Sequence, residues 1–87
     1  MSTEFRPGYH LRPIERGEIG EISKISEELE ELKEAMEQNA RIMALVELAD
    51  LIGAIKLYLT AKFPGFTLAD LEQMADIAAR AFRNGRR

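Results

Sequence analysis

The residues with the clearest chemical potential are carboxylates that recur at three-residue spacing in two separate segments. Glu28 and Glu31 lie in the first segment, and Glu47 and Asp50 lie in the second. Residues three apart are neighbours on one face of an α-helix, so each segment would present a pair of acids. Four carboxylates without a thiol or an imidazole form an all-oxygen site, which suits Mg²⁺ or Mn²⁺. We call these four residues the acidic centre.

The second pair of acids interrupts an apolar segment. Residues 42–59 read IMALVELADLIGAIKLYL, and Lys56 is the only other charge among them. Burying an ionised carboxylate is costly unless a cation compensates for it. A bound metal ion would compensate for the buried charge. The alternative is a structural salt bridge, for which the chain offers Lys24, Arg41 and Lys56.

The first pair belongs to a segment with the periodicity of an amphipathic helix, from about Glu18 to Gln38–Asn39. Its apolar residues recur at steps of three and four, which is the spacing of one helix face. They are Ile19, Ile22, Ile25, Leu29, Leu32 and Met36. On a wheel of about 100° per residue, Glu28 and Glu31 border this apolar stripe. We expect the other acids to face water, namely Glu27, Glu30, Glu34 and Glu37.

Two further helices are predicted. The segment 42–59 is apolar nearly all round, which is typical of a buried helix. A membrane span is the alternative, but two acids near its middle would be expensive in hydrocarbon. Phe63-Pro64-Gly65 then ends the helix, Thr67 with Asp70 is typical of a helix start, and Gly85 ends the third helix.

These elements predict an all-α fold, because no strand-like alternation of apolar and polar residues occurs. Residues 1–17 carry Pro and Gly without a sustained period and are read as an irregular arm, and residues 18–87 form the helical domain. An antiparallel hairpin of the first two helices would bring the two acid pairs to one level. A helix that is apolar on all sides also needs a partner surface. We therefore expect a four-helix-bundle dimer or tetramer.

The overall composition excludes several classes of protein. The chain of 87 residues has no cysteine and a single histidine, so thiolate chemistry and sites needing two imidazoles are excluded. Nine of its fifteen acids lie between Glu15 and Glu37, which argues against a surface that binds nucleic acid. The first residues lack the apolar core of a secretory signal. We therefore expect no membrane association and a cytoplasmic protein.

The acid pattern resembles a known family. The motif E-E-x-x-E at Glu27–Glu31, followed by E-x-x-D at Glu47–Asp50, is similar to that of the MazG-type all-α nucleotide pyrophosphohydrolases. Lys24 and the apolar flanks of the second motif, VELADLIGAI, strengthen the resemblance. The stretch FPGFTLADLEQMADIAARAFRNGRR is similar to the third helix of small, phage-type members. The resemblance covers residues 18–87.

The resemblance implies hydrolysis of (deoxy)nucleoside triphosphates to the monophosphate and pyrophosphate. It implies Mg²⁺ or Mn²⁺ bound by the acidic centre, purine deoxynucleotides such as dGTP as substrates, and location in the host cytoplasm for a phage protein. Glu27 and Lys24 are assigned to catalysis, although Lys24 could simply pair with Glu28. The residues that we expect to bind substrate are Asp76, Arg80 and Arg83. Asp76 and Arg80 could instead pair with each other.

Two other functions fit the same sequence. A non-catalytic helical dimerisation module would keep the apolar helices but would have no need of acids inside them. An acid-rich regulator that masks a partner's basic surface would show strong sensitivity to salt. Only the enzyme hypothesis requires a response to divalent cations.

Overall fold

The computed structural model describes residues 12–85, and within this range helices are the only regular secondary structure. Its elements are α1 (Ile22–Glu37), α2 (Arg41–Lys62) and α3 (Leu68–Arg83). The predicted all-α fold is confirmed, although α1 begins four residues later than expected. Gly20 has a positive φ of 86°, and Glu21 donates to the Glu18 carbonyl at 3.0 Å, so residues 18–21 form a turn ahead of the helix. Residues 1–11, with His10 and most of the predicted arm, lie outside the described residues.

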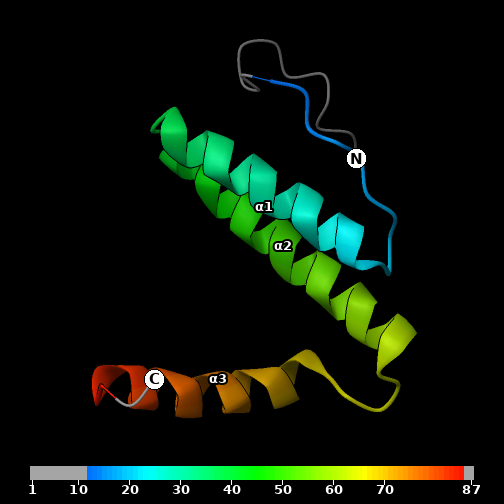
Figure 1. Cartoon of the computed structure of the whole chain (residues 1–87), viewed down its shortest axis with the longest axis vertical. Helices are drawn as coiled ribbons and strands as arrows, with labels where there is room; N and C mark the ends of the chain where they lie inside the picture. Colours follow the sequence, from blue (N-terminus) through cyan, green and yellow to red (C-terminus); the bar gives the residue numbers. More distant parts are fainter. Residues whose placement is uncertain (1–11, 86–87) are drawn as a thin grey trace.

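The first two helices form an antiparallel hairpin (Figure 1). α1 ends at Glu37, and Asn39 has a φ of 57°, in the left-handed region that asparagine tolerates better than most residues. The Ala40 N–H donates to the Ala35 carbonyl at 2.8 Å, which satisfies one of the carbonyls left free at the helix end. The predicted interruption at Gln38–Asn39 is confirmed.

This turn places the two acid pairs level with each other. Glu31 and Glu47 are each eight residues from Asn39, and Glu28 and Asp50 are each eleven residues from it. Both helices rise by about 1.5 Å per residue, so positions at equal distance from the turn lie side by side in an antiparallel hairpin. The expectation that the hairpin brings the acids to one level is confirmed.

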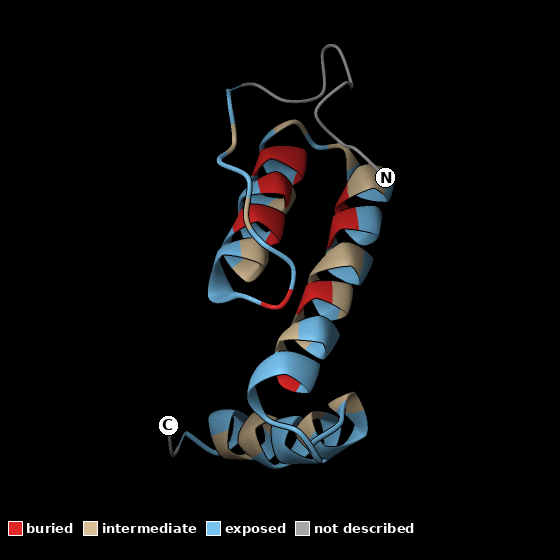
Figure 2. Ribbon diagram, turned by 90° about the vertical axis from the view of Figure 1, so that its right-hand side faces the viewer, coloured by how far each residue is buried: buried red, intermediate tan, exposed pale blue. Residues whose placement is uncertain are grey.

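The interface between α1 and α2 holds few large apolar side chains. Ala35 and Ala44 are its buried apolar residues near the turn, packed against Leu32, Ala40 and Met43. Figure 2 shows buried positions of the two helices along the sides that face each other. Small residues allow the helices to approach closely, which leaves the rest of this interface to the acids.

Within a single chain, α2 therefore does not cover much of the apolar stripe of α1. Ile22, Leu29 and Met36 are exposed, whereas Glu28 and Glu31 are buried against α2. Large apolar side chains of α2 are exposed as well. α2 is the longest of the three helices, with 22 residues. Even so, no helix in residues 12–85 is both long enough and apolar enough to cross a membrane.

The third helix crosses the far end of the hairpin and contacts α2 but not α1 (Figure 1). α2 ends at Lys62, just before Phe63-Pro64-Gly65, as predicted. The Thr67 hydroxyl accepts from the Asp70 N–H at 3.3 Å, and the Asp70 carboxylate accepts from the Thr67 N–H at 2.9 Å. This reciprocal pair satisfies two backbone donors at the start of α3 and confirms the predicted cap.

Replacement of the capping hydroxyl should destabilise α3. Thr67→Ala removes the acceptor for the Asp70 N–H, and the loss of such a cap typically costs about 1 kcal/mol. We expect Thr67→Ser to keep most of this stability because serine retains the hydroxyl. Circular dichroism melts measure the difference, and equal midpoints for the wild type and Thr67→Ala would contradict the role of the cap.

Candidate metal centre

The acidic centre is assembled where α1 and α2 face each other. One carboxylate oxygen from each of its four residues lies within 4.8 Å of the others. Three of the four side chains are buried, with exposed fractions of 5% for Glu28, 2% for Glu31 and 0% for Glu47. Asp50 is half-buried and lies at the edge that opens to solvent. Oxygen ligands from two helices at this spacing match the donor set that Mg²⁺ and Mn²⁺ prefer.

The electrostatics of this cluster are unfavourable without an added cation. Desolvation by burial and the neighbouring charge of Glu31 raise the pKa of Glu28 above its ordinary value, although Lys24 opposes the rise. One oxygen of Glu28, Oε1, is buried and accepts no hydrogen bond. Buried polar atoms of this kind usually have a partner, so the residues present fit a ligand that supplies positive charge.

Lys24 is a cation that the structure places beside the centre. Its ammonium lies 3.1 Å from Glu27 Oε1 and 3.2 Å from Glu28 Oε2. Burial lowers the pKa of Lys24, but the hydrogen bonds and charges of the two glutamates outweigh that effect and raise it. The ion pair between Lys24 and Glu28, which we considered as the alternative to a catalytic role, is present in the structure. It places Lys24 at the rim of the acidic centre.

The prediction that Glu27 faces water is wrong, because its side chain is only 8% exposed. Residues 12–20 lie over this part of α1, and the Gly17 N–H donates to Glu27 Oε1 at 2.9 Å. A Cβ atom at Gly17 would collide with the Ser23 carbonyl, so the approach requires glycine. The periodicity of α1 carries no signal for this contact, because the covering segment precedes the helix in sequence.

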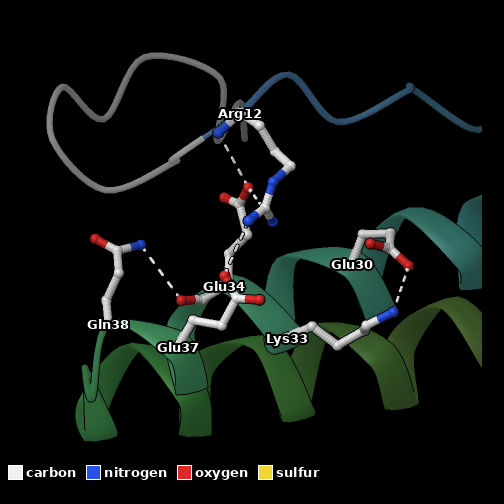
Figure 3. Close-up of polar contacts among 6 residues, drawn as sticks. All are labelled: Arg12, Glu30, Lys33, Glu34, Glu37 and Gln38. Atoms are coloured by element: carbon white, nitrogen blue, oxygen red, sulfur yellow. Dashed lines mark hydrogen bonds and ion pairs between the residues drawn. The ribbon is translucent and has the colours of Figure 1, made fainter.

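Glu34 is also buried, contrary to the prediction, and is only 1% exposed. Figure 3 shows the reason: Arg12 lies over it from the segment before α1. The Arg12 N–H donates to Glu34 Oε2 at 3.1 Å, and its guanidinium reaches the same oxygen at 3.3 Å and Glu37 Oε1 at 3.1 Å. Glu30 and Glu37 are exposed, as predicted.

The predicted substrate-binding residues of α3 lie apart from the acidic centre within one chain. Asp76, Arg80 and Arg83 are all exposed. α3 contacts only α2 among the described helices and lies beyond the end of the hairpin (Figure 1). Their role in substrate binding stays a prediction, and it would require a second chain to carry α3 to the site.

Comparison with family models, with curated proteins and with solved structures gave no match for this chain.

The pKa of Glu28 predicts how pH affects the stability of the metal-free protein. Because folding raises this pKa above 4.5, the folded state binds the proton more tightly than the unfolded chain. The resulting stabilisation is complete at pH values below 4.5 and is lost as the pH rises through the folded-state value. Glu28→Gln should remove that loss, so its melting midpoint in EDTA should fall less between acidic and neutral pH.

The matched control for this experiment is Glu30→Gln, which removes an exposed carboxylate from the same helix. The control should follow the wild-type pH profile. Parallel profiles for the wild type and Glu28→Gln would show that Glu28 has no raised pKa in the folded protein.

Proposed function

We propose that this protein is a metal-dependent nucleoside triphosphate pyrophosphohydrolase of the MazG type, which releases pyrophosphate and a nucleoside monophosphate. The observation that supports the proposal is the convergence of four carboxylates from two helices within 4.8 Å, three of them buried. A purely structural hairpin would gain nothing from this arrangement, because hydrophobic side chains of similar size are often as good or better in such positions. A cation site, by contrast, requires carboxylates, which would explain why they are buried here despite the unfavourable free energy.

The acidic centre would hold Mg²⁺ or Mn²⁺. When bound, such an ion neutralises triphosphate charge and lowers the pKa of a water molecule that attacks phosphorus. The protein's own contribution is a rigid set of oxygen ligands, because Glu31 and Glu47 are held between packed helices rather than on loops. Asp50 lies at the open edge of the centre, where a phosphate would approach.

Lys24 is proposed to stabilise negative charge on the phosphates. It lines the same pocket as Glu28 and Asp50, so its ammonium adjoins the metal ligands without being one of them. Glu27 accepts from both Lys24 and Gly17, and we assign it a positioning role for these two groups. A preorganised cation stabilises the charge that builds up on the phosphates during transfer.

The substrate preference is proposed from the family resemblance alone. Purine deoxynucleotides, dGTP in particular, are the expected substrates. The enzyme would remove or adjust nucleotides of a cytoplasmic pool. For a phage protein, this would be the cytoplasm of the host. A panel of the common NTPs and dNTPs, assayed for pyrophosphate release with Mg²⁺, tests this directly.

We also propose that the protein self-associates through the outer faces of the hairpin. Ile42, Leu45 and Leu48 of α2 have exposed fractions of 77%, 66% and 42%, and Met36 of α1 is 61% exposed. Contiguous exposed apolar surface on a small domain commonly marks an interface. A symmetric dimer or tetramer of hairpins would cover these side chains and complete a four-helix bundle.

Asp50→Asn is the sharpest test of the proposed activity. It should lower kcat by at least about a hundredfold, the upper range for losing even an outer partner of a metal ligand. The fold should persist in EDTA, because the change removes one repelling charge from the cluster. Glu72→Gln, an exposed acid on α3, is the matched control. Near-normal pyrophosphate release by Asp50→Asn would overturn the proposal.

Thermal melts separate the enzyme from a non-catalytic dimerisation module. Mn²⁺ should raise the melting midpoint of the wild type, since a ligand that binds only the folded state stabilises it. The same addition should shift Asp50→Asn much less. A wild-type midpoint that ignores both Mn²⁺ and Mg²⁺ would favour the dimerisation module.

Sedimentation velocity tests the proposed assembly. The wild type should be a dimer or tetramer at micromolar concentration, and Leu45→Glu should shift it toward the monomer by placing a charge in the apolar contact. Gln73→Glu, an exposed position on α3, should leave the distribution unchanged. A wild-type monomer would contradict self-association.

A further inference from the structure

A pocket of about 350 Å³ opens beside the acidic centre, between α1, α2 and the segment that precedes α1. Its charged lining residues are Arg16, Lys24, Glu27, Glu28 and Asp50, and its apolar or small lining residues are Ile19, Ala49, Gly53, Ala54 and Leu57. Along α2, Gly53, Ala54 and Leu57 follow Asp50 on the side away from the turn, and we call this stretch the apolar end. The part of the lining that α2 supplies therefore changes from charged at Asp50 to apolar or small further along the helix.

Gly53 gives the apolar end its open floor. A Cβ atom built at this position would meet nothing within 4 Å, so no neighbouring side chain or backbone requires glycine there. Glycine inside a helix is destabilising relative to alanine because it gains no packing and loses more conformational freedom. Its presence in the middle of α2 is unexplained by the packing of this chain, and it leaves room above the helix.

The open floor continues the face of α2 that carries the metal ligands. Glu47, Asp50 and Gly53 follow at intervals of three residues, so Asp50 is the neighbour of Glu47 and Gly53 the neighbour of Asp50 on the surface of the helix. Gly53 lies about 4.5 Å along the helix axis from Asp50, given a rise of 1.5 Å per residue. A molecule whose charged part is at Asp50 would extend its next part over Gly53.

We propose that the nucleoside part of the substrate lies in this pocket, over Gly53, while the phosphates lie at the acidic centre. The inference rests on the proposed function and specifies where that site continues. A nucleoside triphosphate has a charged end and an uncharged, flat end, which is the polarity of the pocket. The volume lies within the range of small-molecule sites. Van der Waals contact of a ring with a helix face is closest where no Cβ intervenes.

The segment before α1 supplies the opposite wall. Arg16 and Ile19 line the pocket from this segment. Gly17, between them, is attached to α1 by its hydrogen bond to Glu27, and Glu18 is attached by its N–H to the Ser23 hydroxyl at 3.1 Å. Gly17 in this wall and Lys24 at the charged part of the pocket both donate to Glu27, so one glutamate positions both groups.

The experiment fills the floor and compares ligands with and without a nucleoside. Gly53→Leu, Gly53→Ala and the wild type are assayed with Mg²⁺ for the KM of each common dNTP, and for inhibition by imidodiphosphate, which carries two phosphorus groups and no nucleoside. Thr60→Leu places the same leucine side chain at an exposed position of α2 outside the pocket. Mn²⁺-dependent melting midpoints and sedimentation are recorded for every variant.

Gly53→Leu should raise the KM for the best dNTP by about tenfold or more, with a smaller change in kcat, because ground-state binding is lost. Gly53→Ala should raise KM less and should melt at a higher temperature than the wild type. Inhibition by imidodiphosphate and the response to Mn²⁺ should be retained in both variants. Thr60→Leu should match the wild type.

Three outcomes would overturn the inference while leaving the proposed activity intact. They are an unchanged KM in Gly53→Leu, an equal loss of imidodiphosphate inhibition, and dissociation of the oligomer by Gly53→Leu but not by Thr60→Leu. The last result would mean that a second chain occupies the floor. A wild type that neither hydrolyses a dNTP nor responds to Mn²⁺ would instead refute the proposed function itself.

Discussion

The structure depends on the enclosure of like charges between two helices. At an effective dielectric constant of 20, two full negative charges 4.8 Å apart repel by about 3 kcal/mol, and the acidic centre contains several such pairs. Lys24 at the rim reduces this cost, and burial together with the charge of Glu31 still raises the pKa of Glu28. One lysine does not neutralise four carboxylates. A cation bound between the helices would relieve this repulsion, and the energy released would add to the free energy of its binding.

This arrangement explains why the larger apolar side chains point outward. The hairpin interface is occupied by acids and alanines, so Leu45 and Met36 have no position between α1 and α2. The amphipathic character of the helices is thus divided between a polar interface within the chain and an exposed apolar surface on its outside. A second chain that covers the outer faces would provide the hydrophobic stabilisation that a hairpin of this size lacks alone.

Much of the fold could be predicted from local sequence signals. The helix ends at Asn39 and at Phe63-Pro64-Gly65 and the cap at Thr67 depend on backbone chemistry that single residues report. The convergence of the acids followed from three-residue spacing and one antiparallel turn. The burial of Glu27 and Glu34 could not be predicted, because their covering groups, the N–H groups of Gly17 and Arg12, come from a segment without periodicity. A backbone N–H group can donate a hydrogen bond whatever its side chain is, so such contacts cannot be recognised from the types of the residues that make them.

The position of Asn39 midway between the acid pairs has a consequence for how this chain can vary. One residue inserted in α2 between the turn and Glu47 would move the two acids of α2 by about 1.5 Å along the axis and rotate them by about 100° relative to the turn. Single insertions or deletions there would separate the two pairs, whereas length changes after Lys62 would leave them together. In related chains, the number of residues from the first acid pair to the second should therefore change by whole helical turns on both sides, or not at all.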